Sequence, residues 1–507
     1  QMVNVNLGHQ HPTLVKSIQD QAAKLSTIAP GFANDTRSEA ARLITSVAPE
    51  GLNHVFFTNG GAEAVENAVK MARIHTGRDK VMAAYRSYHG ATATAITLTG
   101  EPRRFNNRHT DSGVVHFMGP YTYQSPFWSE SEEQECERAL AHLEQQIILE
   151  GSHTIAAVIM EPVVGGMGVI VPPKGYLKGL KEICDRYGIL FIADEVMVGF
   201  GRCGTWFTFD NFDVTPDIIT FAKGSNSGYV PLGGVVMSDA IYETFAEKVF
   251  PGGLTYSGHP LACAPVVATF EVFEEEKILD RVNDLADRVI RPRLEAMREK
   301  HAIVGDVRGL GMFWAIELVK NKQTREPLVP YNAQGDDAKP MNEFAAACKK
   351  AGLWPFVGMN RTHVAPPLTI PEEDLIRGLD IIDEALEGLA AAEAARKIDG
   401  ATVRKLGDIF DQMRIRLRAI RDGRIADWAG RLAQELTVLD LAFHAVVLRA
   451  ADNDTLRRIL EDQRVFSQIF GRPIKGPPTV EAMNTRLALI CRGHYRMLHA
   501  FARHDAD

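Results

Sequence analysis

Short apolar runs alternate with helical patterns between residues 53 and 240. Runs this continuous are typical of parallel strands that are buried on both faces, and the helical stretches between them would supply the crossovers. The pattern therefore predicts an α/β fold with a mainly parallel, doubly wound sheet flanked by helices. The runs that predict strands are HVFFT (54–58), KVMAAY (80–85), IAAVIM (155–160), ILFIADEV (189–196) and DIITFA (217–222).

The later part of the chain divides into two regions. Residues 275–320 and 340–390 alternate helix and strand again, which predicts a second, smaller lobe. Beyond them the patterns are helical, and they predict an all-α bundle that folds as its own unit. We place the boundary near residue 396. The expected units are residues 1–396, with a large domain at about 40–270 and a small lobe at about 275–396, and residues 397–507.

Composition narrows the class of protein. The chain has 507 residues, 45% of them hydrophobic and 24% charged, which is ordinary for a globular protein of two or three domains. A net charge of −8 argues against nucleic-acid binding, and no apolar run approaches the ~18 residues of a membrane span. The six cysteines are scattered and the first thirty residues lack a signal peptide, so we expect a cytoplasmic protein. The chain opens inside an apparently folded segment, so we expect further sequence upstream.

Lys223 lies between an apolar run and a glycine-rich stretch, in TFAKGSNSGYVPLGG. It could mark a strand end and point into water, or it could be buried with its charge neutralised as a Schiff base. Asp194 ends the preceding apolar run, and ligands of such sheets bind beyond the carboxyl ends of strands. A lysine and a carboxylate at neighbouring strand ends are what pyridoxal phosphate requires, although a plain ion pair would give the same pattern.

Three further segments carry candidate ligands for that cofactor. TNGGAEA (58–64) would place the amides of Gly60, Gly61 and Ala62 at a helix N-terminus, where a phosphate can bind, although such a turn is often only a turn. RSYHG (86–90) supplies Tyr88, which could stack on a planar ring or belong to the core. GGLTYSGHP (252–260) supplies Thr255 as a possible phosphate ligand.

In this order the segments resemble the class III (ω-amino acid) aminotransferases, which have the type I fold of pyridoxal-phosphate-dependent transferases. The resemblance covers about residues 1–393 and centres on IADEVMVGFGRCGTWFTFDNFDVTPDIITFAKGSNSGYVPLGG. It implies that Lys223 forms the Schiff base and moves the proton, and that Asp194 pairs with the pyridine nitrogen. It also implies that Val196 and Tyr88 lie on the two ring faces. His89 joins the cofactor-binding group, Gly60, Gly61 and Ala62 hold the phosphate, and Thr255 reaches the phosphate of the other subunit in a homodimer or larger assembly.

The same resemblance gives the expected reaction. Met197 and Gly166 stand where many family members that use 2-oxoglutarate have Gln and Glu, which favours the branch that transfers amino groups from ω-amino acids, taurine or simple amines to pyruvate, taurine–pyruvate aminotransferases among them. The expected function is therefore a ping-pong transamination between an amine and a 2-oxo acid. Arg361, in GLWPFVGMNRTHVAPPL (352–368), is the candidate for binding a substrate carboxylate or sulfonate, with a solvated surface arginine as the alternative.

The C-terminal region resembles a second family. VLDLAFHAVVLRAADNDTLRRIL (438–460) and GHYRMLHAFARHDAD (493–507) are similar to the FCD ligand-sensing domain of GntR-type transcription regulators. The resemblance implies a divalent metal held by Asp440, His444 and His494, although an Asp and a His on one helix face are usually ordinary polar residues. The chain would then be a fusion cut at both ends. The alternative function is a ligand-sensing regulator remnant that uses both units as binding modules.

Overall fold

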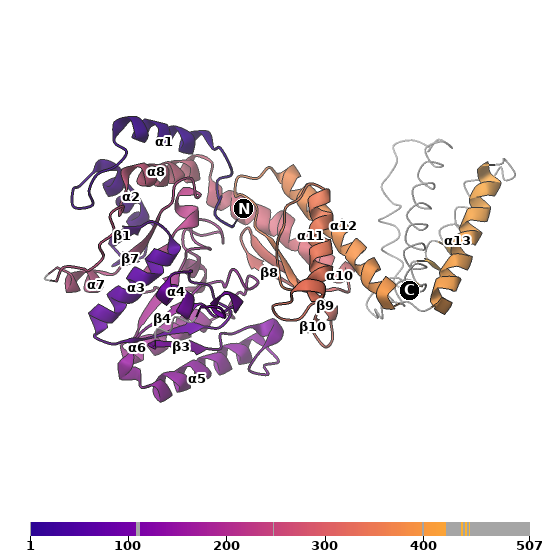
Figure 1. Cartoon of the computed structure of the whole chain (residues 1–507), viewed down its shortest axis with the longest axis horizontal. Helices are drawn as coiled ribbons and strands as arrows, with labels where there is room; N and C mark the ends of the chain where they lie inside the picture. Colours follow the sequence, from indigo (N-terminus) through magenta and orange to yellow (C-terminus); the bar gives the residue numbers. More distant parts are fainter. Residues whose placement is uncertain are drawn as a thin grey trace.

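The computed structural model describes residues 2–107, 112–246, 248–397 and 400–421, and the single residues 438, 439, 442, 443 and 446. Its large domain is built on a seven-stranded sheet in the order β1-β7-β6-β5-β4-β2-β3 (Figure 1). The strands, in that order, are His54–Thr58, Gly233–Met237, Ile218–Phe221, Leu190–Asp194, Ile155–Met160, Lys80–Ala84 and Val114–Phe117. β7 runs antiparallel to both of its neighbours, and the other paired strands are parallel. The prediction of a mainly parallel sheet is therefore confirmed.

Both faces of this sheet are buried, as the continuous apolar runs predict. All six residues of β4 are buried. Ile155 and Val158 belong to one core, together with residues of α5 (Glu132–Glu150) and α6 (Tyr176–Tyr187). Ala157 and Ile159 belong to the core on the opposite face, together with residues of α3 (Gly61–Thr76). The helices thus cover the two faces and leave the carboxyl ends of the parallel strands for a site.

The small lobe has a sheet in the order β10-β9-β12-β11, with β8 paired to β9. Its strands are antiparallel wherever they pair. The strands β8 to β12 span Val304–Leu310, Phe313–Asn321, Glu326–Pro327, Phe356–Gly358 and Arg361–Val364. Helices α10 (Arg291–Lys300), α11 (Lys339–Lys350) and α12 (Glu372–Lys397) share one apolar core with this sheet. The predicted smaller lobe of alternating helix and strand is therefore present.

The remaining helices cover the large domain or connect the lobes. α1 (Pro12–Lys24) and α2 (Asp35–Ser46) pack on α8 (Pro260–Glu275), and α9 (Ile278–Leu285) leads into the small lobe. α4 (Ala93–Leu98) and α7 (Asp239–Thr244) lie near α3. α12 continues through residue 396, where we predict the domain boundary, and α13 spans Gly400–Arg421. Within the described residues, no helix is long and apolar enough to cross a membrane.

Arg202 joins the two lobes from a fully buried position. Its Nη1 donates to the carbonyls of Met312 (3.2 Å) and Pro366 (2.6 Å) in the small lobe, and its Nη2 donates to Asn6 Oδ1 (2.9 Å). Asn6 in turn donates to the carbonyl of Phe200 (2.8 Å) in the large domain. Burial lowers the pKa of Arg202 to about 10, and its Nε has no hydrogen-bond partner among the described residues. One guanidinium thus holds the N-terminal segment, the large domain and the small lobe together.

We expect Arg202→Met to destabilise the protein because it leaves these buried acceptors without a donor, at a cost of about 3 kcal/mol in the free energy of unfolding. Urea denaturation followed by circular dichroism measures the change. Arg377→Met is the control, since Arg377 is 74% exposed and pairs with Asp374 one turn earlier. Its transition should move by less than about 0.5 kcal/mol. Equal midpoints for the wild type and Arg202→Met would show that Arg202 does not join the lobes.

Candidate active site

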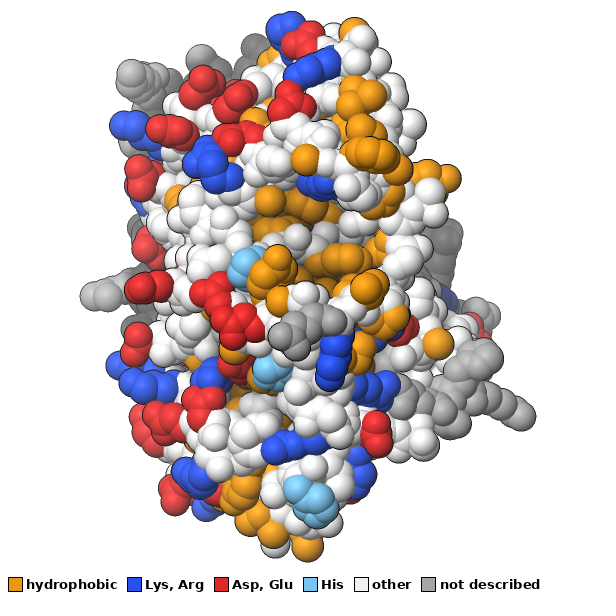
Figure 2. Space-filling model, turned by 90° about the vertical axis from the view of Figure 1, so that its left-hand side faces the viewer, with side chains coloured by type: hydrophobic (Ala, Val, Ile, Leu, Met, Phe, Trp, Pro, Cys, Tyr) orange, Lys and Arg blue, Asp and Glu red, His pale blue; other side chains and the backbone are white. Residues whose placement is uncertain are grey.

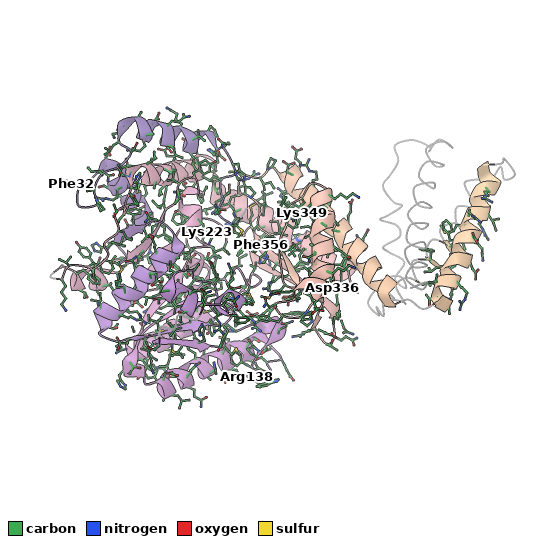
Figure 3. All side chains as sticks on the ribbon, in the orientation of Figure 1. Phe32, Arg138, Lys223, Asp336, Lys349 and Phe356 are labelled. Atoms are coloured by element: carbon green, nitrogen blue, oxygen red, sulfur yellow. The ribbon has the colours of Figure 1, made fainter. Side chains whose placement is uncertain are left out.

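Lys223 and Asp194 lie beyond the ends of two neighbouring strands, as the sequence predicts. Asp194 ends β5 and is paired in register with Thr220 of β6, and Lys223 follows β6 by two residues. Figure 3 shows Lys223 in the large domain, on the side toward the small lobe. Burial lowers the pKa of Lys223, and its neighbours Asp194 and Glu161 oppose that shift. The first alternative, a lysine that points freely into water, does not fit this environment.

Asp194 is 2% exposed and fully hydrogen-bonded. His89 Nδ1 lies 2.6 Å from its Oδ2, while the Thr220 hydroxyl (3.0 Å) and the Val196 amide (3.1 Å) donate to its Oδ1. A buried carboxylate needs such donors, because burial without them costs several kcal/mol. The ring of His89 is itself buried, and its Nε2 has no hydrogen-bond partner within the described residues. These three partners hold the carboxyl group of Asp194 in a fixed orientation at the strand end.

Sequence reasoning missed Glu161, which follows β4 and is also buried. Its two oxygens accept from the amides of Tyr88 and Gly165, each at 2.9 Å. The pKa of Glu161 is raised to about 7, chiefly by burial; His89 opposes this shift and Asp194 adds to it. The rule that singled out Asp194, a carboxylate directly after a buried strand, applies equally to Glu161. This residue holds Tyr88 and the loop of residues 165–168 in place.

The glycine turn before α3 has the shape of an anion cradle. Gly60 is the N-cap residue and supplies no side chain, so the first amides of α3 have no acceptor within the helix. A Cβ on Gly61 would lie 2.6 Å from Val196 Cγ1, so only glycine lets Val196 approach the start of the helix. Ala62 follows as the second helical residue. The structure therefore brings the predicted cradle and Val196 together, and these residues fit a bound phosphate.

Tyr88 and Thr255 differ in their surroundings. Tyr88 is partly buried, and the guanidinium of Arg103 lies over its ring at 3.5 Å from the centroid. Thr255 is exposed, on the segment that leads into α8. An exposed position is consistent with a residue that contacts a second subunit. The role of Thr255 in binding that subunit's phosphate remains a proposal.

Arg361, at the start of β12, is 5% exposed, so the interpretation as a solvated surface arginine is wrong. Its Nη2 lies 3.4 Å from Met167 Sδ and 3.5 Å from Met359 Sδ, and its Nε has no partner among the described residues. Burial lowers its pKa to about 10, and Glu317 opposes that shift. A Cβ on Gly168 would lie 2.6 Å from Arg361 Cδ. A buried guanidinium with a free donor is suited to an anionic ligand.

Several non-glycine residues around the site have left-handed backbones. Lys223 has φ +38°, Arg86 has φ +70° and Met359 has φ +51°. Val169, directly after the 165–168 loop, has φ +49°. This conformation costs roughly 1 kcal/mol or more for each such residue, and it is concentrated at functional sites because the surrounding structure enforces it.

The predicted metal ligands Asp440, His444 and His494 lie outside the described residues. Among the residues that the structure describes, no group of three His, Cys, Asp or Glu side chains could hold a metal ion. The structure therefore gives no support to a metal in the C-terminal domain.

Comparison with known proteins agrees with the fold. Residues 1–386 match the family Aminotransferase class-III, and residues 382–507 match the FCD domain. The chain therefore belongs to the class-III aminotransferases, enzymes with the type I fold that transfer amino groups with pyridoxal phosphate as cofactor. Both resemblances seen in the sequence are thus confirmed.

Individual relatives act on different substrates. The chain is 35% identical over 401 residues to putrescine–pyruvate aminotransferase of Pseudomonas aeruginosa, covering 77% of this chain and 86% of that protein. It is 32% identical to gamma aminobutyrate transaminase 2 of Solanum lycopersicum, covering 75% and 85%. The solved taurine:2-oxoglutarate aminotransferase of Bifidobacterium kashiwanohense, in complex with PLP and glutamate, is 42% identical with a TM-score of 0.73, covering 76% and 87%.

The buried Glu161 leads to a prediction about pH. Its pKa is about 7 in the folded protein against 4.5 for the free side chain, so the folded state binds the proton more tightly. The contribution of Glu161 to stability therefore falls as pH rises from about 4.5 to about 7, by about 3 kcal/mol in all. Glu161→Gln removes this dependence. Its stability relative to the wild type should rise by that amount between pH 4.5 and pH 8, whatever constant offset the substitution adds.

Urea unfolding of both proteins at pH 4.5, 6, 7 and 8, without added ligand, measures the difference. Glu137→Gln, on the exposed face of α5, serves as the control for the loss of a surface carboxylate. A difference for Glu161→Gln that is constant with pH would show that the pKa of Glu161 is the same in the folded and unfolded states.

Proposed function

We propose that the chain transfers an amino group from an ω-amino acid, taurine or a simple amine to a 2-oxo acid by a ping-pong mechanism. The observation that carries the proposal is the pair of Lys223 and Asp194 beyond adjacent strands, with His89 hydrogen-bonded to Asp194 and the buried Glu161 nearby. Pyridoxal phosphate supplies an electron sink that lets a proton leave the carbon next to the substrate nitrogen. The side chains of the site bind and orient this cofactor.

Each predicted site residue has a role in this proposal. Lys223 holds the cofactor covalently and moves the proton at its Nζ, which its lowered pKa favours because more of the amine is unprotonated. Asp194 keeps the pyridine nitrogen protonated, and His89 orients Asp194. The amides of Gly60, Gly61 and Ala62 bind the phosphate. Val196 and Tyr88 take the two faces of the ring.

Pyruvate is the acceptor we propose. The putrescine–pyruvate relative supports it, whereas the taurine:2-oxoglutarate neighbour is named for the other common acceptor. Met197 lies against Gly165, where a Cβ would be 2.2 Å from its sulfur, so the side chain that distinguishes this site faces the 165–168 loop. Arg361, buried at the other end of that loop, is proposed to bind a substrate carboxylate or sulfonate. To identify the acceptor, the purified protein is incubated with taurine and either pyruvate or 2-oxoglutarate. Formation of alanine indicates that pyruvate is the acceptor, and formation of glutamate indicates 2-oxoglutarate.

We further propose that the active form is at least a dimer, in which Thr255 reaches the partner's phosphate. Figure 2 shows apolar side chains gathered over the centre and upper part of one hollowed face. Contiguous exposed apolar surface of this kind marks interaction sites. The exposed position of Thr255 agrees with this assembly.

A second candidate function is supported by the FCD match at residues 382–507. In that case the aminotransferase unit would serve a regulator as a binding module. We propose residues 1–396 as the catalytic unit and residues 397–507 as the other unit. Turnover by the purified chain would separate the two functions, because a binding module needs no catalysis.

We expect Lys223→Ala to abolish transamination and also the covalent attachment of the cofactor after borohydride reduction. The reason is that Lys223 supplies the amine at this strand end. Mass spectrometry of the reduced protein gives the measurement. Lys178→Ala, on the exposed side of α6, is the matched control and should be labelled like the wild type. Cofactor still fixed to the Lys223→Ala chain would assign the bond to another lysine.

We expect Asp194→Ala to retain cofactor, because the phosphate cradle is untouched, while transamination falls by a factor of about 100 or more. An unprotonated pyridine withdraws electrons poorly. The experiment compares cofactor content by absorbance with the rate of amino transfer. Asp185→Ala, an exposed carboxylate on α6, should change neither. Near-normal turnover in Asp194→Ala would remove this residue from the mechanism.

A further inference from the structure

Arg103 is a cation at the site that no sequence motif singled out. It lies in a short 3-10 helix (Pro102–Arg104) after α4, and its guanidinium carbon is 3.5 Å from the centroid of the Tyr88 ring. Its Nε donates to Glu101 Oε1 at 2.6 Å, and its own amide donates to the same oxygen at 3.2 Å. Glu101 is buried, whereas the side chain of Arg103 is 50% exposed. A buried carboxylate therefore holds one edge of an otherwise open guanidinium.

The other edge of this guanidinium is free to bind. An arginine carries five N–H donors in a planar fork, and Glu101 uses the one on Nε. Within the part of the chain that the structure describes, neither Nη1 nor Nη2 of Arg103 has a hydrogen-bond partner. Stacking on Tyr88 fixes the plane of the fork without using these donors. Two parallel donors in a fixed plane match the geometry of a carboxylate.

Three neighbours show that the fork lies at the reacting end of the site. It stacks on Tyr88, whose amide is held by the active-site carboxylate Glu161. A Cβ on Gly166 would be 3.6 Å from Arg103 Nη2, so the absence of a side chain at residue 166 leaves the fork open on that side. The charge of Arg103 also reaches Lys223, whose pKa it lowers.

Arg361 occupies the other end of the same loop. It lies against Gly168, and its charged neighbours include Glu317, Arg308 and Arg86. The two arginines thus define two anion positions, Arg103 at the Gly166 end of the loop and Arg361 at the Gly168 end.

We propose that Arg103 binds the carboxylate next to the reacting carbon of the 2-oxo acid and of the amino acid formed from it, and that Glu101 holds the guanidinium in place between turnovers. This inference deepens the proposed function and rests on it. Arg103 becomes a specificity-determining residue. It recognises α-amino and α-oxo acids and contributes nothing to amines that carry no acid. The more distant acidic group of a longer substrate is left to Arg361.

The first test is binding without turnover. Propanoate has the carboxylate of alanine and pyruvate but no amino or oxo group, so it binds without reacting. Calorimetric titration of the holoenzyme should give a propanoate affinity that falls about 10-fold or more in Arg103→Gln, since charged hydrogen bonds are lost. Arg103→Lys should recover part of the loss as a point charge.

The second test compares two half-reactions by the absorbance of the bound cofactor. Arg103→Gln should slow the reaction with alanine about 10-fold or more at low concentration and leave the reaction with propylamine within about 2-fold. Arg104→Gln is the matched control. It removes the same charge from the adjacent residue, whose guanidinium lies over Tyr85 at 5.5 Å, and it should change both reactions by less than about 2-fold.

The two tests distinguish a wrong role for Arg103 from a wrong proposed function. Unchanged propanoate affinity in Arg103→Gln, an equal loss in Arg104→Gln, or an equal slowing with propylamine would overturn the role of Arg103. A wild-type protein that reacts with none of alanine, propylamine and taurine would overturn the proposed function instead. Propanoate titration would still report whether Arg103 binds a carboxylate in that case.

Discussion

The burial of one carboxylate at the end of β5 sets the arrangement of the rest of the site. Asp194 is surrounded by protein, so its charge must be met by donors from other segments. Thr220 comes from the adjacent strand β6, His89 from the loop after β2, and the Val196 amide from the turn that follows Asp194 itself. These donors converge because β6, β5, β4 and β2 are consecutive in the sheet and end at the same edge. The strand order of the sheet therefore determines which groups meet at Asp194.

A second carboxylate extends the site toward the small lobe. Glu161 holds the amides of Tyr88 and Gly165, and the loop that begins at Gly165 reaches the small lobe through Gly168, whose carbonyl accepts from Arg308 Nε at 2.9 Å. Arg308 is in turn paired with Asp306 at 2.8 Å and with Glu317 at 2.6 Å. Movement between the lobes would act directly on this loop, and through it on the position of Tyr88.

The sequence predicts those features that depend on short segments. Continuous apolar runs predict the buried strands, and Lys223 and Asp194 stand out because each follows such a run. The antiparallel direction of β7 is not predictable in this way, because a buried strand such as GGVVM has the same pattern in either direction. The burial of Arg361 and the stacking of Arg103 on Tyr88 depend on tertiary packing. His89 and Asp194 are 105 positions apart, so their contact could not be predicted from the sequence and follows only from the order of the strands in the sheet.

The left-handed residues around the site bear on how the protein can evolve. Arg86, Val169, Lys223 and Met359 hold backbone conformations that glycine would adopt at less cost. Selection for heat resistance alone would therefore favour replacements at the positions that carry or border the reacting groups. Activity opposes that drift, since each replacement also removes a side chain from the site. Directed evolution for thermal stability would be better aimed at the surfaces of α5 and α6, where substitutions do not remove side chains from the site.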